Sequence, residues 1–146
     1  MSYSPVLRLG LAAAFVISGA TAALADASAN SRDDDIFWIV EVTINDGKDA
    51  AFDSLMSDMV ASTKTEEGIT NYEWMRNGAV VHQYERYDDA AAVLAHLGGF
   101  GKFAESYFDV FSLTGFTVYG SVPDNVKEAI AGFKPVYLEK AGGFAR

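Results

Sequence analysis

The sequence predicts an α+β domain whose elements follow the order β-α-β-β-α-β, the ferredoxin-like arrangement, with a C-terminal helix and strand added to it. Three observations lead to this prediction. A strand pattern over residues 36–44 precedes an amphipathic helix pattern over 48–66, an Asn77-Gly78 turn joins two alternating segments, and a helix pattern follows the second of these. The chain has 146 residues and half of them are hydrophobic, which suffices for one well-buried domain.

The segment from residue 79 to residue 100 holds the strand and helix around which the rest of the chain is arranged. Asp88 and Asp89 are suited to cap this helix, which is predicted to end at Gly98-Gly99. Its spacing predicts a buried stripe of Val93, Leu94 and Leu97. Alternation along the strand predicts that Val80, His82, Tyr84 and Arg86 point to one side of the sheet and that Val81, Gln83, Glu85 and Tyr87 point to the other.

The first strand is apolar on both of its sides, since Trp38 and Val40 alternate with Phe37 and Ile39. A sheet with helices on one face and water on the other is expected to alternate between apolar and polar residues. The pattern therefore predicts a cover for both faces. In so small a domain a second copy of the chain is the simplest second cover, so we expect a homodimer whose sheets pack face to face.

The remaining segments complete the expected order of elements. A strand over 69–75 leads into a turn formed by Arg76-Asn77-Gly78. Val126 and Ile130 are expected to face the core from a short helix near the C-terminus. The later elements are predicted as a helix over 100–111, a strand over 113–119, the short helix beginning at Pro123-Asp124, and a strand over 136–138.

The N-terminal residues have the pattern of a secretory signal peptide. Arg8 precedes an apolar run, and Ala23-Leu24-Ala25 then places small residues at the two positions that a signal peptidase recognises. We expect residues 1–25 to be removed and residues 26–35 to form a flexible lead-in. The protein would then be periplasmic or secreted, with no membrane contact after cleavage. The alternative is an uncleaved membrane anchor, although the apolar run is short for a membrane span.

Composition excludes several classes of function. The formal net charge is −9 and no basic stripe is present, so nucleic acid is not an expected partner. The absence of cysteine excludes a disulfide scaffold, a thiolate nucleophile and sulfur-ligated metals. The two histidines, His82 and His96, lack the spacing of a metal site, and no phosphate-binding glycine motif occurs. We therefore expect neither a metal nor a cofactor.

Three motifs resemble the antibiotic biosynthesis monooxygenase family of the dimeric α+β barrel superfamily. They are the strand Asn71-Tyr72-Glu73-Trp74, the strand end Tyr84-Glu85-Arg86-Tyr87, and the alanine-rich helix that ends in His96-Leu97. The resemblance covers residues 36–116, and residues 117–146 form a C-terminal extension of the same domain. It implies a ferredoxin-like sheet that pairs with a second copy to form a dimeric α+β barrel. It also implies oxidation of a small quinol or polycyclic phenol by molecular oxygen without flavin, haem or metal.

The chemistry that this resemblance implies needs a base for a phenolic proton and an apolar pocket. His82 or His96 is the candidate base, and Arg86 is the candidate partner of the phenolate. The candidate substrate contacts are Tyr72 and Trp74 as an aromatic wall, together with Tyr84 and Asn71. Each of these residues also has an ordinary structural interpretation, such as core packing, a dimer contact or a surface ion pair. Convergence requires that the strand face carrying His82, Tyr84 and Arg86 meets Tyr72 and Trp74 across the hairpin.

Two other functions remain open from the sequence. One is a non-enzymatic ligand-binding or structural dimer that keeps the fold without the chemistry. The other is haem binding or degradation, which the superfamily also includes. Against haem, the first strand lacks the polar Asn that such proteins use and Tyr87 stands where they have Trp, which leaves His96 as the only plausible axial ligand.

Overall fold

The computed structural model describes residues 35–143. The expected signal peptide and nearly all of the expected lead-in lie outside the described residues. The elements run in the order β1 (Ile36–Ile44), α1 (Asp49–Thr63), β2 (Ile69–Asn77), β3 (Val80–Tyr87), α2 (Ala90–Phe100), α3 (Ala104–Val110), β4 (Phe111–Tyr119), α4 (Asp124–Ile130), the 3₁₀ helix η1 (Ala131–Phe133) and β5 (Val136–Leu138). This order confirms the predicted α+β fold and its C-terminal helix and strand.

The strands form one open sheet in the order β2-β3-β1-β4-β5. The central strand β1 pairs antiparallel with β3 and with β4, and β3 pairs antiparallel with β2. Strand β5 adds to the edge of β4 in a parallel orientation. This is the ferredoxin-like strand order with one additional edge strand.

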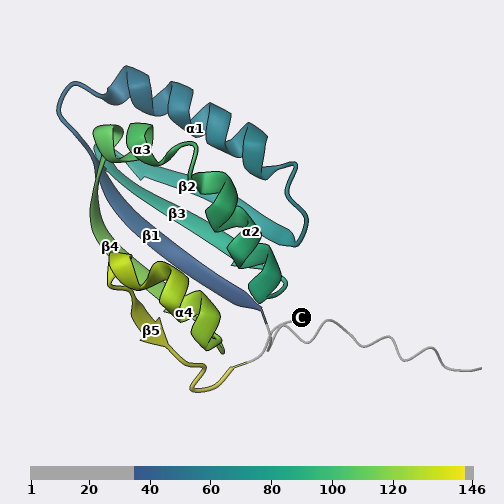
Figure 1. Ribbon diagram of the computed structural model, residues 1–146. Coiled ribbons are helices and arrows are strands. Elements are labelled where there is room, and N and C mark those ends of the chain that lie inside the picture. Colours follow the sequence, from purple (N-terminus) through teal and green to yellow (C-terminus); the bar gives the residue numbers. More distant parts are fainter. Residues whose placement is uncertain (1–34, 144–146) are drawn as a thin grey trace, which may run out of the picture.

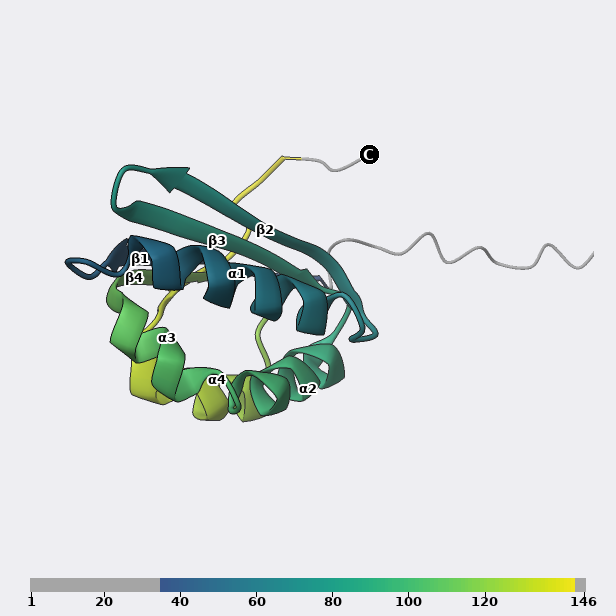
Figure 2. The same ribbon diagram turned by 90° about the horizontal axis from the view of Figure 1, so that it is seen from above.

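The four α-helices of residues 35–143 lie on one face of the sheet (Figures 1 and 2). We call this face of the sheet the inner face and the opposite one the outer face. On β1, the inner-face residues Trp38 and Val42 are buried, whereas Phe37 and Ile39 of the outer face are only half-buried. The sequence pattern of β1 predicts that both faces of the sheet are covered. The helices of the described residues cover the inner face only. None of these helices is long and apolar enough to cross a membrane.

The hydrophobic core between the sheet and the helices has two parts. One part gathers Trp38, Tyr87, Val93 and Val118 with residues of α4, and the other gathers residues of α1, α3 and the opposite end of β1. Helix α4 belongs fully to the core, because Val126 and Ile130 are completely buried as predicted. The C-terminal extension is therefore a structural part of the domain.

Helix α2 differs from the sequence prediction at its end and on its buried face. Asp89 caps it as expected, with its side chain accepting a hydrogen bond from the Ala92 N–H at 2.8 Å. The helix continues through Gly98-Gly99 to Phe100, since neither glycine adopts a positive φ angle. The buried residues are Ala92, Val93 and His96, whereas Leu94 is exposed. The prediction was right for Val93, and Leu97 is partly buried against the core. It was wrong for Leu94, because hydrophobicity favoured Leu94 over a histidine whose buried partners come from other elements.

The β2–β3 hairpin turn begins two residues later than predicted. Strand β2 extends to Asn77, which pairs with Val80, so the turn consists of Gly78 and Ala79. Gly78 alone has a positive φ of 60°, and Asn77 remains extended as part of the ladder. Strand β4 likewise begins at Phe111, two residues before the expected start, because Phe111 is already paired with Ile44.

Gly68 fixes the approach of α2 to the beginning of β2, and its replacement should be costly. Its φ is +78°, and a Cβ placed on it would lie 2.7 Å from the Ala92 Cβ. We expect Gly68→Ala to lower the free energy of unfolding by about 2–3 kcal/mol through backbone strain and overpacking. Gly78→Ala is the control, because its φ is also positive but nothing lies near its Cβ position. Urea unfolding that gives equal losses for both variants would contradict the packing argument.

Candidate active site

A cavity lies between the inner face of the sheet and the helices. Its volume is about 60 Å³, and a buried water needs roughly 10–15 Å³ on the same measure, so it has room for about four to six waters. The sheet contributes Trp38, Val40, Gln83, Glu85, Leu113 and Phe116. The helical side contributes Met59, His96, Leu97, Phe100, Tyr107, Phe108 and Phe133. Most of these side chains are apolar or aromatic, as expected for a pocket that takes an aromatic molecule.

Phe108 and Phe133 lie at the solvent-exposed rim of this cavity. Phe108 is 47% exposed, and its ring stacks on Phe133 with centroids 6.3 Å apart. Gln83 lies deeper on β3 and is 2% exposed, with its amide nitrogen donating to the Tyr107 hydroxyl at 2.7 Å. Burial raises the pKa of Tyr107 above its ordinary value, so this hydroxyl keeps its proton. The cavity therefore runs from an aromatic rim to a polar interior.

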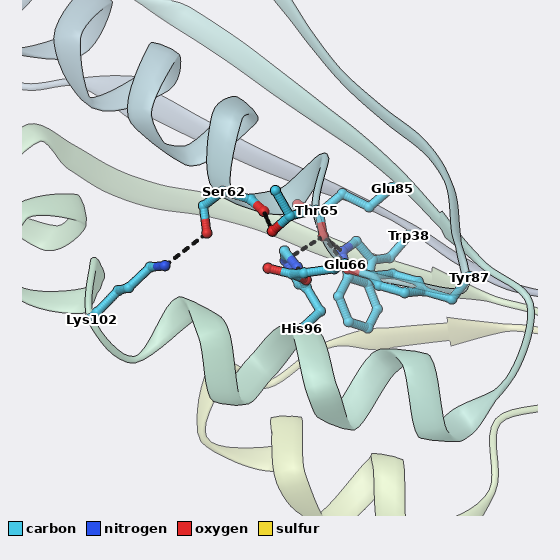
Figure 3. Close-up of polar contacts among 8 residues, drawn as sticks. All are labelled: Trp38, Ser62, Thr65, Glu66, Glu85, Tyr87, His96 and Lys102. Carbon is cyan, nitrogen blue, oxygen red and sulfur yellow. Dashed lines mark hydrogen bonds and ion pairs between the residues drawn. The ribbon is translucent and has the colours of Figure 1, made fainter.

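Glu85 is the buried acid of the cavity and is held by two donors. Its Oε2 atom accepts hydrogen bonds from the Trp38 indole N–H at 2.6 Å and from the Tyr87 hydroxyl at 2.5 Å (Figure 3). Burial raises the pKa of Glu85 above the ordinary value of 4.5, although His96 and both hydrogen bonds act in the opposite direction. Burial and the neighbouring Glu85 also raise the pKa of Tyr87, which keeps its hydroxyl a donor. Glu85 is thus a buried carboxyl group that holds a proton more tightly than an exposed glutamate does.

His96 lies between Glu85 and a second carboxylate, Glu66. Its side chain points from α2 toward the sheet, where Nδ1 is 2.8 Å from Glu66 Oε2 and Nε2 is 3.5 Å from Glu85 Oε2 (Figure 3). The His96 side chain is 6% exposed and the Glu66 side chain 18%, so Glu66 lies nearer to solvent. A buried histidine between two carboxyl groups is a common arrangement for acid–base chemistry.

The structure places three of the sequence-predicted site residues on the inner side of the sheet. They are His96, Tyr72 and Trp74. The Tyr72 ring contacts the His96 ring with centroids 5.7 Å apart, and Trp74 packs against Phe52 and Phe111. Tyr72 and Trp74 are not among the residues that line the cavity. Tyr72 packs against His96 from outside the cavity, and Trp74 belongs to the neighbouring hydrophobic core.

The other predicted site residues lie on the outer face. In the β2–β3 ladder, Tyr72 is opposite Glu85 and Trp74 is opposite Gln83, whereas Asn71 is opposite Arg86. The structure therefore does not bring His82, Tyr84 and Arg86 to Tyr72 and Trp74, and the condition for convergence is not met. Directly opposed residues of an antiparallel pair share a face, which is the physical reason.

On the outer face Arg86 belongs to an aromatic cluster. Its guanidinium carbon lies 5.1 Å from the centre of the Phe37 ring, and its Nε is 3.5 Å from Asp35 Oδ2. Phe37 also stacks on Tyr119 and contacts Tyr84. Arg86 therefore stabilises the outer surface of the sheet and does not reach the cavity.

The candidate site residues predicted from the sequence did not include Glu85 or Glu66. Glu85 was assigned to the face of β3 opposite His82, which is correct, but that face was not identified as the one that lines a cavity. One signal in the sequence could have indicated this. Glu85 shares its strand face with Gln83, Tyr87 and the apolar Val81, which is typical of a buried face with polar groups. Glu66 gave no sequence signal, since a glutamate at the end of a helix pattern is ordinary. Among residues 35–143, no cluster of three or more histidines and acids is arranged to hold a metal ion.

Residues 35–100 match the model of the antibiotic biosynthesis monooxygenase family. This match confirms the resemblance drawn from the motifs of this part of the chain. No match was found among curated proteins.

Solved structures of three other proteins share the fold. MupZ from Pseudomonas fluorescens is 24% identical with a TM-score of 0.72, over 77% of this chain and 90% of that one. SnoaB from Streptomyces nogalater, a cofactor-independent oxygenase, is 16% identical with a TM-score of 0.53, over 62% and 95%. A putative antibiotic biosynthesis monooxygenase from Caulobacter crescentus is 20% identical with a TM-score of 0.55, over 61% and 91%. At these identities the likeness establishes a common fold.

Proposed function

We propose that the protein is a cofactor-independent monooxygenase that oxidises a small phenol or quinol with molecular oxygen in the cavity. The observation that carries the proposal is an aromatic cavity whose ionisable lining groups include a buried acid and a buried imidazole, Glu85 and His96. The family match and the cofactor-independent oxygenase among the structural neighbours support the same class of reaction. The apolar walls would keep water from reactive oxygen intermediates.

The proposed reaction uses only substrate, oxygen and a base. His96 removes the phenolic proton, and the electron pair of the broken O–H bond stays on the phenolate. The phenolate passes an electron to dioxygen, and the two radicals then form a C–O bond at a ring carbon that carries hydrogen. The proton stored on His96 then passes to the terminal oxygen of this peroxide. The O–O bond breaks as the ring carbon loses its own proton, and the departing hydroxide takes up that proton to become water. One oxygen atom remains in a quinone, so the ring is oxidised by four electrons and dioxygen is reduced by four.

The size of the cavity favours a single-ring substrate over a polycyclic one. Room for about four to six waters approaches the size of one aromatic ring and is well short of several fused rings. We therefore propose a small quinol or simple phenol as the substrate class. A cavity of about 60 Å³ is also too small to enclose a haem, which argues against the haem-binding alternative.

We also propose that the protein acts as an exported homodimer. The outer face carries the half-buried Phe37 and Ile39 and the exposed Met75, side by side with polar groups. A second copy packed on this face would remove that apolar surface from water and form the dimeric α+β barrel. The pattern of residues 1–25 supports export to the periplasm or beyond.

Oxygen uptake by the metal-free and flavin-free protein tests the proposed function. With single-ring quinols and phenols, we expect uptake above spontaneous autoxidation, with a quinone as product. Val40→Phe should lower this uptake about 100-fold, because the added ring occupies the cavity and displaces the substrate. Val60→Phe is the matched control, since Val60 is exposed on α1 and does not line the cavity. Absence of enzyme-dependent uptake across the panel would overturn the proposal and favour a non-enzymatic binding dimer.

A further inference from the structure

We propose that one proton-transfer group is formed by Glu66, His96 and Glu85. Glu66 orients His96 and fixes its tautomer so that His96 can act as the base, and Glu85 completes the polar end of the cavity beside it. This inference rests on the proposed function, because it assigns the residues that handle the substrate proton. Glu66 acts through His96 and is a positioning residue. His96 and Glu85 both line the cavity, so either can touch the substrate.

Glu66 determines which nitrogen of His96 is available to the substrate. A carboxylate accepts hydrogen bonds only, so its 2.8 Å contact with Nδ1 places a proton on that nitrogen. In the neutral imidazole, Nε2 is then the basic nitrogen. Glu66 also stabilises the imidazolium that forms when Nε2 takes a proton, as an acid beside a catalytic histidine does.

The chain leaves space for Glu66 at this position. Gly99 lies in helical conformation on α2, and a Cβ placed on it would lie 2.9 Å from Glu66 Oε1. Any larger residue at position 99 would push the carboxylate away from His96. Gly99 therefore does not end the helix, and its lack of a side chain permits the close approach of Glu66 to α2.

The other side of His96 is arranged for exchange of a proton. Nε2 lies 3.5 Å from Glu85 Oε2, which is longer than an ordinary N–H···O hydrogen bond. Glu85 is held in place by Trp38 and Tyr87, so its position does not depend on His96. The ionisable groups that face the imidazole are Glu66, Glu85, Tyr72 and Tyr87.

The proton step is balanced within this group. The substrate O–H bond breaks, its proton binds His96 Nε2, and its electron pair stays on the phenolate oxygen. No net proton leaves the protein, because the same proton is returned to the departing oxygen as water. The Nδ1 proton stays on His96 throughout and remains hydrogen-bonded to Glu66. The negative charge of Glu66 balances the positive charge of the imidazolium.

Ionisation of bound 4-nitrophenol tests this assignment without any oxygen chemistry. Its phenolate absorbs at longer wavelength than the phenol, and the electron-poor ring resists oxidation. We expect the wild-type protein to bind it as phenolate at pH values where free 4-nitrophenol is still protonated. Glu66→Gln should reduce the ionisation constant of the bound phenol about 10- to 100-fold, which is the usual effect of losing a hydrogen bond to a charged group. His96→Asn should abolish the shift.

Two further variants keep the test decisive. Glu67→Gln removes a neighbouring exposed carboxylate and should leave the ionisation unchanged. Gly99→Ala alters no polar group but displaces Glu66, so it should reproduce part of the Glu66→Gln effect. Equal behaviour of Glu66→Gln and Glu67→Gln would overturn the assignment, as would failure of the wild-type protein to bind or ionise 4-nitrophenol.

The outcomes also separate this inference from the proposed function. Ionisation of 4-nitrophenol that depends on Glu66, without oxygen uptake on any phenol, would uphold the proton-transfer group and reject the monooxygenase. Oxygen uptake that is unaffected by Glu66→Gln would uphold the monooxygenase and reject the role of Glu66.

Discussion

Replacement of His96 by Asn is expected to lower the rate of oxygen uptake by about 10²–10⁴-fold, the usual contribution of a positioned general base. His82→Asn is expected to leave the rate unchanged. His96 is buried and lines the cavity, whereas His82 is exposed on the outer face, opposite Met75 in the ladder. The Asn amide can still donate to Glu66, so the substitution removes the basic nitrogen while keeping one hydrogen bond of the site.

The comparison of the two histidines is a direct test of which one acts as the base. kcat and KM should be measured for both variants with the best substrate of the panel, after subtraction of autoxidation. A loss in kcat confined to His96→Asn supports the cavity as the site. The reverse pattern would move the chemistry to the outer face, where the partner copy of a dimer would have to complete the site.

The order and type of the elements were predictable because they depend on local patterns. The apolar run of β1 was predicted with the bounds Ile36–Ile44 that the structure has. The start of α2 was predictable because the two-residue alternation of the strand changes to a helical spacing at Asp88-Asp89. Both the cap residue and the helical spacing can be recognised from residues that are close in sequence. Helix ends were less predictable, because a glycine pair can either end a helix or continue it, and neither Gly98 nor Gly99 adopts the positive φ that would end α2.

The site was only partly predictable, and the reason is the register of one hairpin. A three-residue turn at Arg76-Asn77-Gly78 would pair Met75 with Ala79 and bring Tyr72 opposite His82. The observed two-residue turn pairs Asn77 with Val80 and brings Tyr72 opposite Glu85 instead. The shift by an odd number of positions exchanges the two faces of β3 relative to β2. Strand alternation alone cannot decide this, since both faces of β3 mix apolar and polar residues.

The partners of His96 illustrate what a single sequence does not reveal. His96 was identified as a candidate base from its residue type, and the structure places it in the cavity. Its two carboxyl partners come from the segment after α1 and from β3, which are separated from it by many residues. Only the packing of α2 across the sheet brings them together, so no spacing rule in the sequence could have joined the three.

The protein is expected to lose stability relative to its Glu85→Gln variant as the pH rises above about 4.5. In the unfolded chain Glu85 titrates near its ordinary value of 4.5, whereas burial raises its pKa in the folded protein. Between these two values unfolding releases a proton, so a higher pH favours the unfolded state. The stability that the protonated carboxyl contributes is fully present below the unfolded pKa and is lost as the pH rises through the folded pKa. The slope can reach about 1.4 kcal/mol per pH unit.

Urea unfolding of both proteins at several pH values between 4 and 8 would measure this difference. Glutamine keeps the size of Glu85 and an acceptor for Trp38 and Tyr87, but it has no proton to lose in this range. Glu128→Gln is the matched control, because Glu128 is exposed on α4 and the same change of charge there should leave the pH dependence of the wild type intact. Parallel stability curves for the wild type and Glu85→Gln would mean that Glu85 ionises in the folded protein as it does in the unfolded chain. The buried acid would then be a carboxylate at neutral pH, and it would compete with Glu66 for the charge on His96.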